Sequence, residues 1–477
     1  MLTGAEKTEL KLPNDFDAMA VKGLKVNNVR STEHDVGAML EHGADLNATH
    51  SLRYTSLHQA ASNGELATAR LLVEHGSVVH VGNKDGWTPL HETAARGYLD
   101  IMQLLLEHGA DLEAVNNDRR TPLHVAASRG ELSAARLLVE RGADVCLQNK
   151  GGWSPLAEAA ARAYFDIAQL LLEHGADVHV QNKGGWTPLA EAAARGYVDV
   201  ARLLLEHGAD VHVQNKGGWT PLAEAAARGY VDAARLLLEH GADVHAQNKS
   251  GWTPLAEAAA RGYVDAARLL LAHGAVVHVQ NKDGWTPLAK AAARGYVDVA
   301  RLLLEHGADV HARNKGGWTP LAEAAAHGHV DVARLLLEHG ADVHAQNKSG
   351  WTPLAEAAVR GYVDAARLLL EHGADVHVQN KDGWAPLAEA AARGHVDVAR
   401  LLLEHGADVH VQNKGGWTPL AEAAARGYVD AARFFLEHGA DVHVQNKNGQ
   451  TPLYEATSRG HIDAAQLLLK HGATASS

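Results

Sequence analysis

The sequence has a single cysteine, few aromatic residues and no long apolar run. The shortage of cysteine and the absence of apolar runs exclude several classes of protein. The only cysteine among 477 residues, Cys146, cannot form an intrachain disulfide or a thiolate zinc site, so folding does not require an oxidising compartment. No run approaches the roughly eighteen apolar residues of a membrane-spanning helix, and Met1 to Asn14 lacks the apolar core of a signal peptide. Walker and dinucleotide-binding glycine patterns are also missing, so neither common nucleotide fold is indicated.

What is present is typical of a folded protein with an acidic balance. Hydrophobic residues make up 46% and charged residues 21%, and the formal net charge is −13, which disfavours binding to phosphate backbones. We therefore expect a cytoplasmic, monomeric protein that binds no nucleic acid and no membrane and needs no cofactor. A non-classical secretion route stays open.

A period of 33 residues dominates the chain. The tripeptide Thr-Pro-Leu begins at positions 88, 121, 187, 220, 253, 286, 319, 352, 418 and 451, and all these spacings are multiples of 33. Degenerate copies at Thr55, Ser154 and Ala385 fill the gaps, and all ten tryptophans directly precede this position. Such self-similarity predicts a repeat array.

The register also sets the expected domain organisation. We expect an N-terminal tail over 1–14, a degenerate N-terminal capping repeat over 15–54, a solenoid of thirteen units over 55–473, and a C-terminal tail over 474–477. Atypical ends suit a solenoid, because each repeat covers the apolar face of its neighbour and the outermost faces need polar lids.

Each unit reads as two helices and a loop, as residues 187–219 illustrate. Thr187 is a natural N-cap before a proline, and a first helix should run to about Arg195, where Gly196 stops it. A second helix, with leucines at helical spacing, should end before Gly208. The remaining residues predict a hairpin-like loop around a β-turn. The expected fold is an all-α repeat solenoid of helix-turn-helix units joined by β-hairpin loops.

The unit resembles the ankyrin repeat, whose pattern includes Gly-x-Thr-Pro-Leu-His-x-Ala-Ala, then Gly-His, then Leu-Leu-Leu-x-x-Gly-Ala-Asp-Val-Asn. The resemblance implies an ankyrin-repeat stack with about thirteen full repeats and a non-catalytic role in protein binding. Two departures recur. The Asn after Asp-Val is replaced by His, for example at His212. The His after Thr-Pro-Leu survives at His91 and His124 but becomes Ala in the interior, for example at Ala190 and Ala223, which removes a hydrogen bond to the N-cap Thr.

A row of carboxylates is the first candidate binding feature. In ankyrin proteins the position directly after the lost His tends to face the concave groove, and such a row could capture a basic partner through many weak contacts. The alternative is local, because most members have an Arg four residues later that provides a helical ion pair. Lys290 interrupts the row. The candidate residues are Glu191, Glu224, Glu257, Glu323, Glu356, Glu389 and Glu422.

The tryptophan column is the second candidate. Tryptophan is enriched at binding hot spots, so rings beside the loop tips could anchor a partner. The same rings could instead pack on neighbouring turns and stiffen the stack of loops. The candidate residues are Trp186, Trp219, Trp252, Trp285, Trp318, Trp351, Trp384 and Trp417.

Histidine is abundant, with 32 residues, yet no metal site is expected, because pairs such as His207 and His212 do not converge across a helix-ending glycine. No catalytic constellation is recognisable, so no enzyme is expected. The sequence therefore predicts a non-catalytic scaffold that binds a basic or extended protein through the concave surface of the first helices and loops. A mechanical spacing rod and a secreted effector that targets a host remain alternatives.

Overall fold

The computed structural model describes residues 45–49 and 52–474, and over these residues it contains 26 helices and no strand. The predicted tail over 1–14, most of the predicted cap over 15–54 and residues 475–477 lie outside the described part. The helices alternate between a first and a second helix of each repeat, which confirms the predicted all-α repeat fold.

The first helices are α2 Ser56–Asn63, α4 Pro89–Ala94, α6 Pro122–Arg129, α8 Pro155–Ala160, α10 Pro188–Ala193, α12 Pro221–Ala226, α14 Pro254–Ala259, α16 Pro287–Arg294, α18 Pro320–Ala326, α20 Pro353–Arg360, α22 Pro386–Ala391, α24 Pro419–Ala425 and α26 Pro452–Ser458. The second helices are α3 Leu66–Glu74, α5 Leu99–Glu107, α7 Leu132–Glu140, α9 Phe165–Glu173, α11 Val198–Glu206, α13 Val231–Glu239, α15 Val264–Ala272, α17 Val297–Glu305, α19 Val330–Glu338, α21 Val363–Glu371, α23 Val396–Glu404, α25 Val429–Glu437 and α27 Ile462–Lys470.

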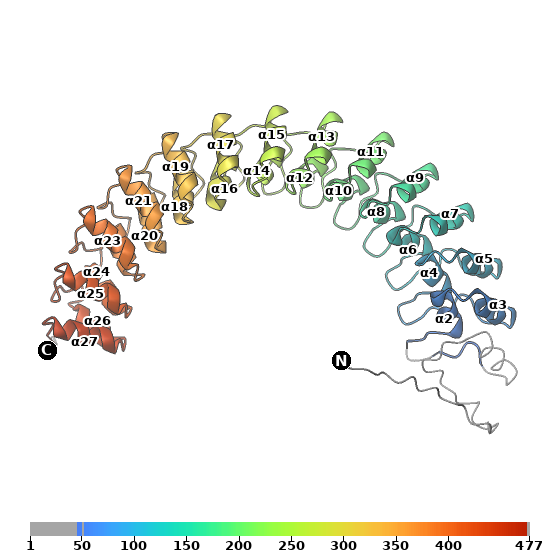
Figure 1. The fold of residues 1–477 in the computed structure, drawn as a ribbon, viewed down its shortest axis with the longest axis horizontal. Helices are drawn as coiled ribbons and strands as arrows, with labels where there is room; N and C mark the ends of the chain where they lie inside the picture. The colour runs from blue at the N-terminus through green and yellow to red at the C-terminus, as the bar shows by residue number, and fades with distance from the viewer. Residues whose placement is uncertain (1–44, 50–51, 475–477) are drawn as a thin grey trace, which may run out of the picture. The chain divides into compact units, whose positions relative to one another are not determined.

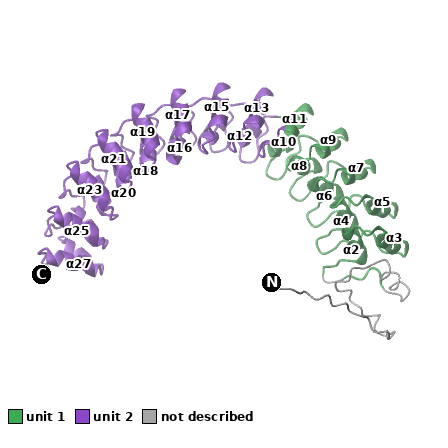
Figure 2. Ribbon diagram, in the orientation of Figure 1, with its two compact units in different colours: residues 1–192, 199–210 green, residues 193–198, 211–477 purple. Residues whose placement is uncertain are grey.

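The chain divides into two compact units, and each has the same internal organisation (Figure 2). Unit 1 comprises Met1–Ala192 with Asp199–Asp210, and unit 2 comprises Ala193–Val198 with Val211–Ser477. Within each unit the first helices form one layer and the second helices another, and the loops project on the side of the first helices (Figure 1).

The first helices begin as the sequence predicts. In α14 the Thr253 hydroxyl accepts a hydrogen bond from the Ala256 amide at 3.3 Å, and Pro254 occupies the first turn, where its missing amide costs nothing. The predicted end of the first helix in repeat 187–219 was too late by two residues, because α10 stops at Ala193. A turn then leads to Gly196, whose φ of +73° only glycine adopts readily.

The second helices end on a histidine cap that recurs in every described repeat except 121–153. In α13 the Nδ1–H of His240 donates to the Leu236 carbonyl at 2.8 Å and satisfies one of the open carbonyls of the last turn. Gly241 follows in the left-handed conformation. Capping therefore accounts structurally for His207, His240 and the histidines at the equivalent position of the other repeats.

The loops are held by an asparagine and linked from repeat to repeat. The side-chain oxygen of Asn248 accepts the amides of Ser250 at 2.9 Å and Trp252 at 3.0 Å, which fixes the turn without a strand. The amide of Lys249 donates to the carbonyl of Gly217 in the preceding loop at 2.9 Å. Successive loop tips in unit 2 therefore form a backbone ladder along the stack.

Small residues and aromatic rings bring neighbouring repeats together. Ala258 and Ala259 of the first helix α14 and Leu270 of the second helix α15 are fully buried. Tyr263 packs on the turn of the preceding repeat, so a methyl group on Gly229 would lie 2.5 Å from its ring. The apolar core of each unit is thus continuous between repeats, as solenoid stability requires.

Candidate protein-binding surface

The candidate carboxylates are buried rather than displayed. Glu257 is 6% exposed, and the other predicted members, Glu191, Glu224, Glu323, Glu356, Glu389 and Glu422, are 5–7% exposed. The expectation of an open acidic surface is therefore wrong. Each carboxylate lies at the fourth position of a first helix, where the first helices of neighbouring repeats pack against one another.

Two kinds of partner hold these carboxylates. The Arg four residues later reaches back to the same group, at 3.3 Å for Arg426 and Glu422 and at 4.0 Å for Arg360 and Glu356. On the other side an asparagine side chain donates, as Asn248 does to Glu257 at 3.1 Å. The ion pairs expected from the helical spacing are therefore present for these residues, and the asparagine ties the loop to the first helix.

Burial shifts the protonation of the carboxylates at the C-terminal end of unit 2. Removal from water raises the pKa of Glu323, Glu356 and Glu389 to about 7, against an ordinary value of 4.5. The next carboxylate in the row adds repulsion, and the neighbouring cations oppose the rise. The pKa of Glu422 is raised for the same principal reason.

The tryptophans lie at the edge of the same surface. Every ring of the column is half-buried, including the predicted residues Trp186, Trp219, Trp252, Trp285, Trp318, Trp351, Trp384 and Trp417. Several rings lie beneath a cation from the segment that directly follows a first helix. The Arg261 guanidinium lies 5.7 Å from the Trp219 ring centroid, and Arg459 lies 5.6 Å from that of Trp417. Such geometry is favourable for cation–π attraction.

The side chains that reach solvent beside these rings are arginines. Side-chain exposure is 42% for Arg261, 44% for Arg360 and 49% for Arg459, whereas their partner carboxylates expose 5–8%. We call the rings and cations of unit 2 together the Trp–Arg surface. Its members are Trp219, Trp252, Trp285, Trp318, Trp351, Trp384, Trp417, Arg228, Arg261, Arg294, Arg360, Arg393, Arg426 and Arg459. Sequence reasoning treated these arginines only as partners of the glutamates, although they have the same 33-residue period.

Lys290 occupies the carboxylate position of its repeat and makes different contacts. Its Nζ lies 3.7 Å from the Trp285 ring centroid and 5.6 Å from that of Trp252. Desolvation lowers its pKa, while Glu323 and Asp283 favour the charged form. The interruption noted in the sequence is therefore an ammonium group between two indoles.

The N-terminal repeats of unit 1 are linked by buried histidines. His91 Nδ1 lies 2.9 Å from the Thr88 hydroxyl, and its Nε2 lies 2.9 Å from the carbonyl of Arg120, which directly precedes the N-cap of the next repeat. Burial lowers the pKa of His91 and of His124 to about 4. The interior repeats, with Ala at this position, cannot form this bridge.

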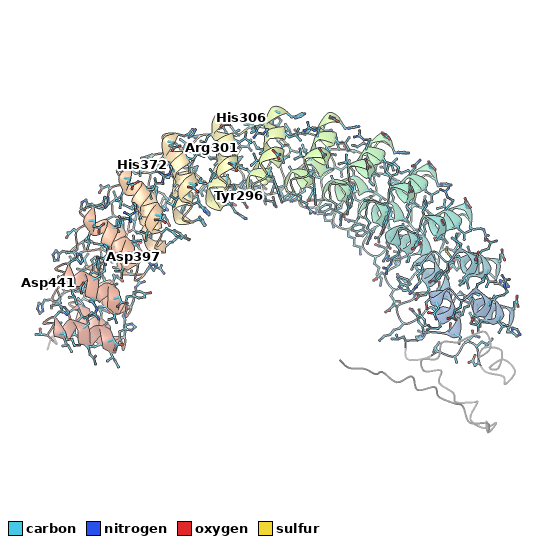
Figure 3. The ribbon with its side chains drawn as sticks, in the orientation of Figure 1. Tyr296, Arg301, His306, His372, Asp397 and Asp441 are labelled. Atoms are coloured by element: carbon cyan, nitrogen blue, oxygen red, sulfur yellow. The ribbon has the colours of Figure 1, made fainter. Side chains whose placement is uncertain are left out.

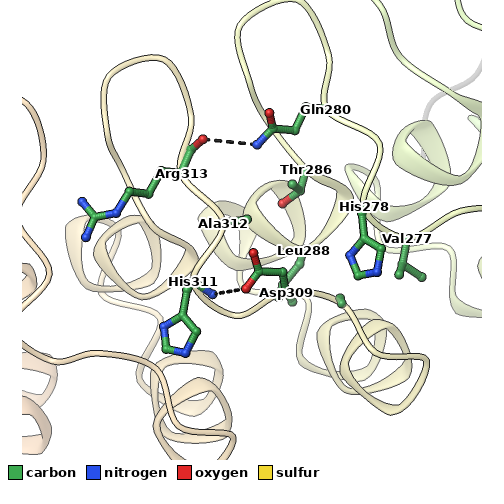
Figure 4. Close-up of a pocket in the computed structure, with 10 residues that line it drawn as sticks. Val277, His278, Gln280, Thr286, Leu288, Asp309, His311, Ala312 and Arg313 are labelled. Atoms are coloured by element: carbon green, nitrogen blue, oxygen red, sulfur yellow. Dashed lines mark hydrogen bonds between the residues drawn. The ribbon is translucent and has the colours of Figure 1, made fainter.

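Pockets occur between adjacent loops rather than in a closed cavity. One in unit 2, of about 520 Å³, is lined by Val277, His278, Arg313 and their neighbours (Figure 4). Gln280 Nε2 donates to the Arg313 carbonyl at 3.2 Å across it, and the Asp309 carboxylate accepts the His311 amide at 2.9 Å. Gln280 therefore links neighbouring loops, whereas Asp309 fixes a turn within its own loop. No group of three potential metal ligands is found within residues 45–49 and 52–474.

Comparison with protein families agrees with this geometry. The family model for ankyrin repeats, in its three-copy form, matches overlapping segments that run from residue 29 to residue 477. The chain belongs to the ankyrin-repeat family. Ankyrin repeats are generally protein–protein interaction modules and are typically not catalytic. No curated protein matches the chain as a relative. Among the helices of the described segments, none is long and apolar enough to cross a membrane.

Proposed function

We propose that this ankyrin-repeat chain is a non-catalytic scaffold that binds a protein partner through the Trp–Arg surface. The observation that carries the proposal is the combination of half-exposed indoles with cations held over them. Tryptophan and arginine are the residue types most enriched at binding hot spots, and rings fixed by packing lose little entropy when a partner docks.

The buried glutamates have a supporting role in this proposal. Because their carboxylates expose so little surface, they offer a basic partner no open array of charges. They instead fix the arginines and the loops that present the tryptophans. We therefore replace direct capture by the carboxylate row with contact through the rings and guanidinium groups in front of it.

The test is affinity purification with mass spectrometry using two matched variants of the full chain. Trp318→Ala with Trp351→Ala removes two neighbouring rings, and a hot-spot role predicts a loss of about 2 kcal/mol or more in binding. Arg334→Ala with Arg367→Ala changes two exposed residues on second helices and should leave capture intact. Circular dichroism must show equal helix content for both variants. Equal capture by all three proteins would contradict the proposal.

A spacing rod is the second candidate, and the near-identity of the interior repeats favours it. Deletion of residues 319–384, which removes two repeats in register, separates the two functions. A spacer should change its activity with length, whereas a partner that docks elsewhere in unit 2 should still bind.

A further inference from the structure

The net charge of −13 conceals an uneven distribution of charge within each repeat. Repeat 220–252 has three cations and four acids, a net charge of −1. Its second helix and the turn after it hold exposed Asp232, Glu239 and Asp243 against one cation, Arg235. The first helix and loop tip hold exposed Arg228 and Lys249.

The acid on the first-helix side does not cancel these cations at the surface. Glu224, the only acid of that part of the repeat, is 6% exposed. A ligand that approaches the first helices therefore meets mainly cations, although a global count indicates an acidic protein. The same pattern holds for the neighbouring repeats of unit 2, in which the loop-tip Lys is exposed throughout.

Two consecutive repeats depart from this pattern, and four of their departures add positive charge. Ala272 and Val276 stand where the adjacent repeats have Glu and Asp, Lys290 stands where they have Glu, and Arg313 stands where they have Gln. Together these four changes raise the formal charge by five units relative to the adjacent repeats. Asp283 at a loop tip cancels one of these five units. Residues 253–318 are thus the most cationic part of an otherwise uniform stack.

Within these repeats Lys290 lies against the Trp–Arg surface, between two of its rings. Its ammonium approaches Trp285 and Trp252, and Arg294 is exposed one helical turn further along α16. Arg261 covers the ring of Trp219 in the same way. Because cations already occupy faces of these indoles, stacking of nucleic-acid bases is disfavoured, and a carboxylate is the better counterpart for the exposed cations.

We propose that the first-helix face of residues 253–318, centred on Lys290 between Trp252 and Trp285, is the docking site for an acidic, extended polypeptide segment. Carboxylates of the segment pair with Lys290, Arg261 and Arg294, and its backbone follows the row of rings. The inference rests on the proposed function, because it specifies the partner's chemistry at the same surface.

The probe is fluorescein-labelled poly-L-glutamate, with poly-L-lysine and an oligothymidylate of matched length for comparison, followed by fluorescence anisotropy at one fixed ionic strength. The full chain should bind polyglutamate and not polylysine. Lys290→Glu restores the residue found in the adjacent repeats and should weaken binding about tenfold, which converts to ~1.4 kcal/mol.

Arg301→Glu is the matched control. It lies in the same repeat and makes the same change of charge, but on the second helix α17, away from the first-helix layer (Figure 3). It should change the affinity less than about twofold, because an exposed charge at a distance is largely screened. Equal losses for both variants would overturn the site, since they would reveal only attraction by overall charge.

A gain of binding provides the complementary arm. Glu389→Lys places an ammonium between Trp351 and Trp384 as Lys290 lies between Trp252 and Trp285, and it should raise the number of polyglutamate chains bound. The Glu389→Lys variant also tests the proposed docking site if the Lys290 variant misfolds. No polyglutamate binding by the unaltered chain, or tighter binding of oligothymidylate that Lys290→Glu abolishes, overturns the inference. If a protein is still captured through the tryptophans, the proposed function survives that result.

Discussion

Glu356 should weaken the fold of unit 2 at neutral and alkaline pH. Burial and the neighbouring Glu389 raise its pKa to about 7 from 4.5, and Arg360 only partly opposes this. The folded protein therefore keeps a proton that the unfolded chain releases between pH 4.5 and 7. Stability contributed by this site is present below pH 4.5 and is lost as the pH rises through 7.

The magnitude follows from the shift. A pKa difference of about 2.5 at 1.36 kcal/mol for each unit gives a penalty of about 3 kcal/mol for the ionised form. Glu356→Gln keeps the shape and removes the charge, while the lost helical pair with Arg360 costs only a few tenths of a kcal/mol. We expect the free energy of unfolding to rise by about 2–3 kcal/mol at pH near 8 and to stay nearly unchanged near pH 4.5.

Urea unfolding followed by circular dichroism measures this difference, and hydrogen exchange with mass spectrometry locates it. Protection should increase in α18 to α22 and not in distant repeats. Glu371→Gln, an exposed residue on α21 of the same repeat, is the control and should change stability by less than about 0.5 kcal/mol. Equal effects of the two variants, or a Glu356 variant that gains nothing at high pH, would refute the reasoning.

Four further outcomes follow from the contacts within and between repeats. His91→Ala should cost unit 1 about 1–3 kcal/mol in urea unfolding, because it leaves buried partners unsatisfied. Because the pKa values of His91 and His124 are lowered to about 4, unit 1 should lose stability as the pH falls from 6.5 to 4. Hydrogen exchange in α4 and α6 measures this loss, and constant protection over that pH range would contradict it. Gly229→Ala should lower the melting temperature by forcing Tyr263 away, and a melting temperature equal to that of the native chain would show that the ring moves freely. Leu303→Ala should cost about 2–5 kcal/mol and raise exchange in α16 to α19, whereas uniform loosening of unit 2 would argue against nearest-neighbour stability.

The local features of each repeat could be predicted from the sequence because their causes lie within a few residues. Thr253 with Pro254 starts a helix, a left-handed glycine such as Gly241 ends one, and an asparagine such as Asn248 holds the loop. The 33-residue period then indicates identical units that stack. Even the ion pairs between Glu and the Arg four residues later follow from helical spacing alone.

The character of the surface could not be predicted in the same way. Glu257 at the fourth position of an isolated helix would be exposed, and packing against neighbouring repeats covers it while leaving Arg261 in solvent. The contact between Arg261 and Trp219 joins residues of different repeats and likewise has no local signal. The sequence determined which residues recur, whereas the stacking of neighbouring repeats decided which of them are removed from water. Because stacking buries the glutamates and leaves the arginines exposed, the surface consists of cations and rings, and the carboxylates lie beneath it.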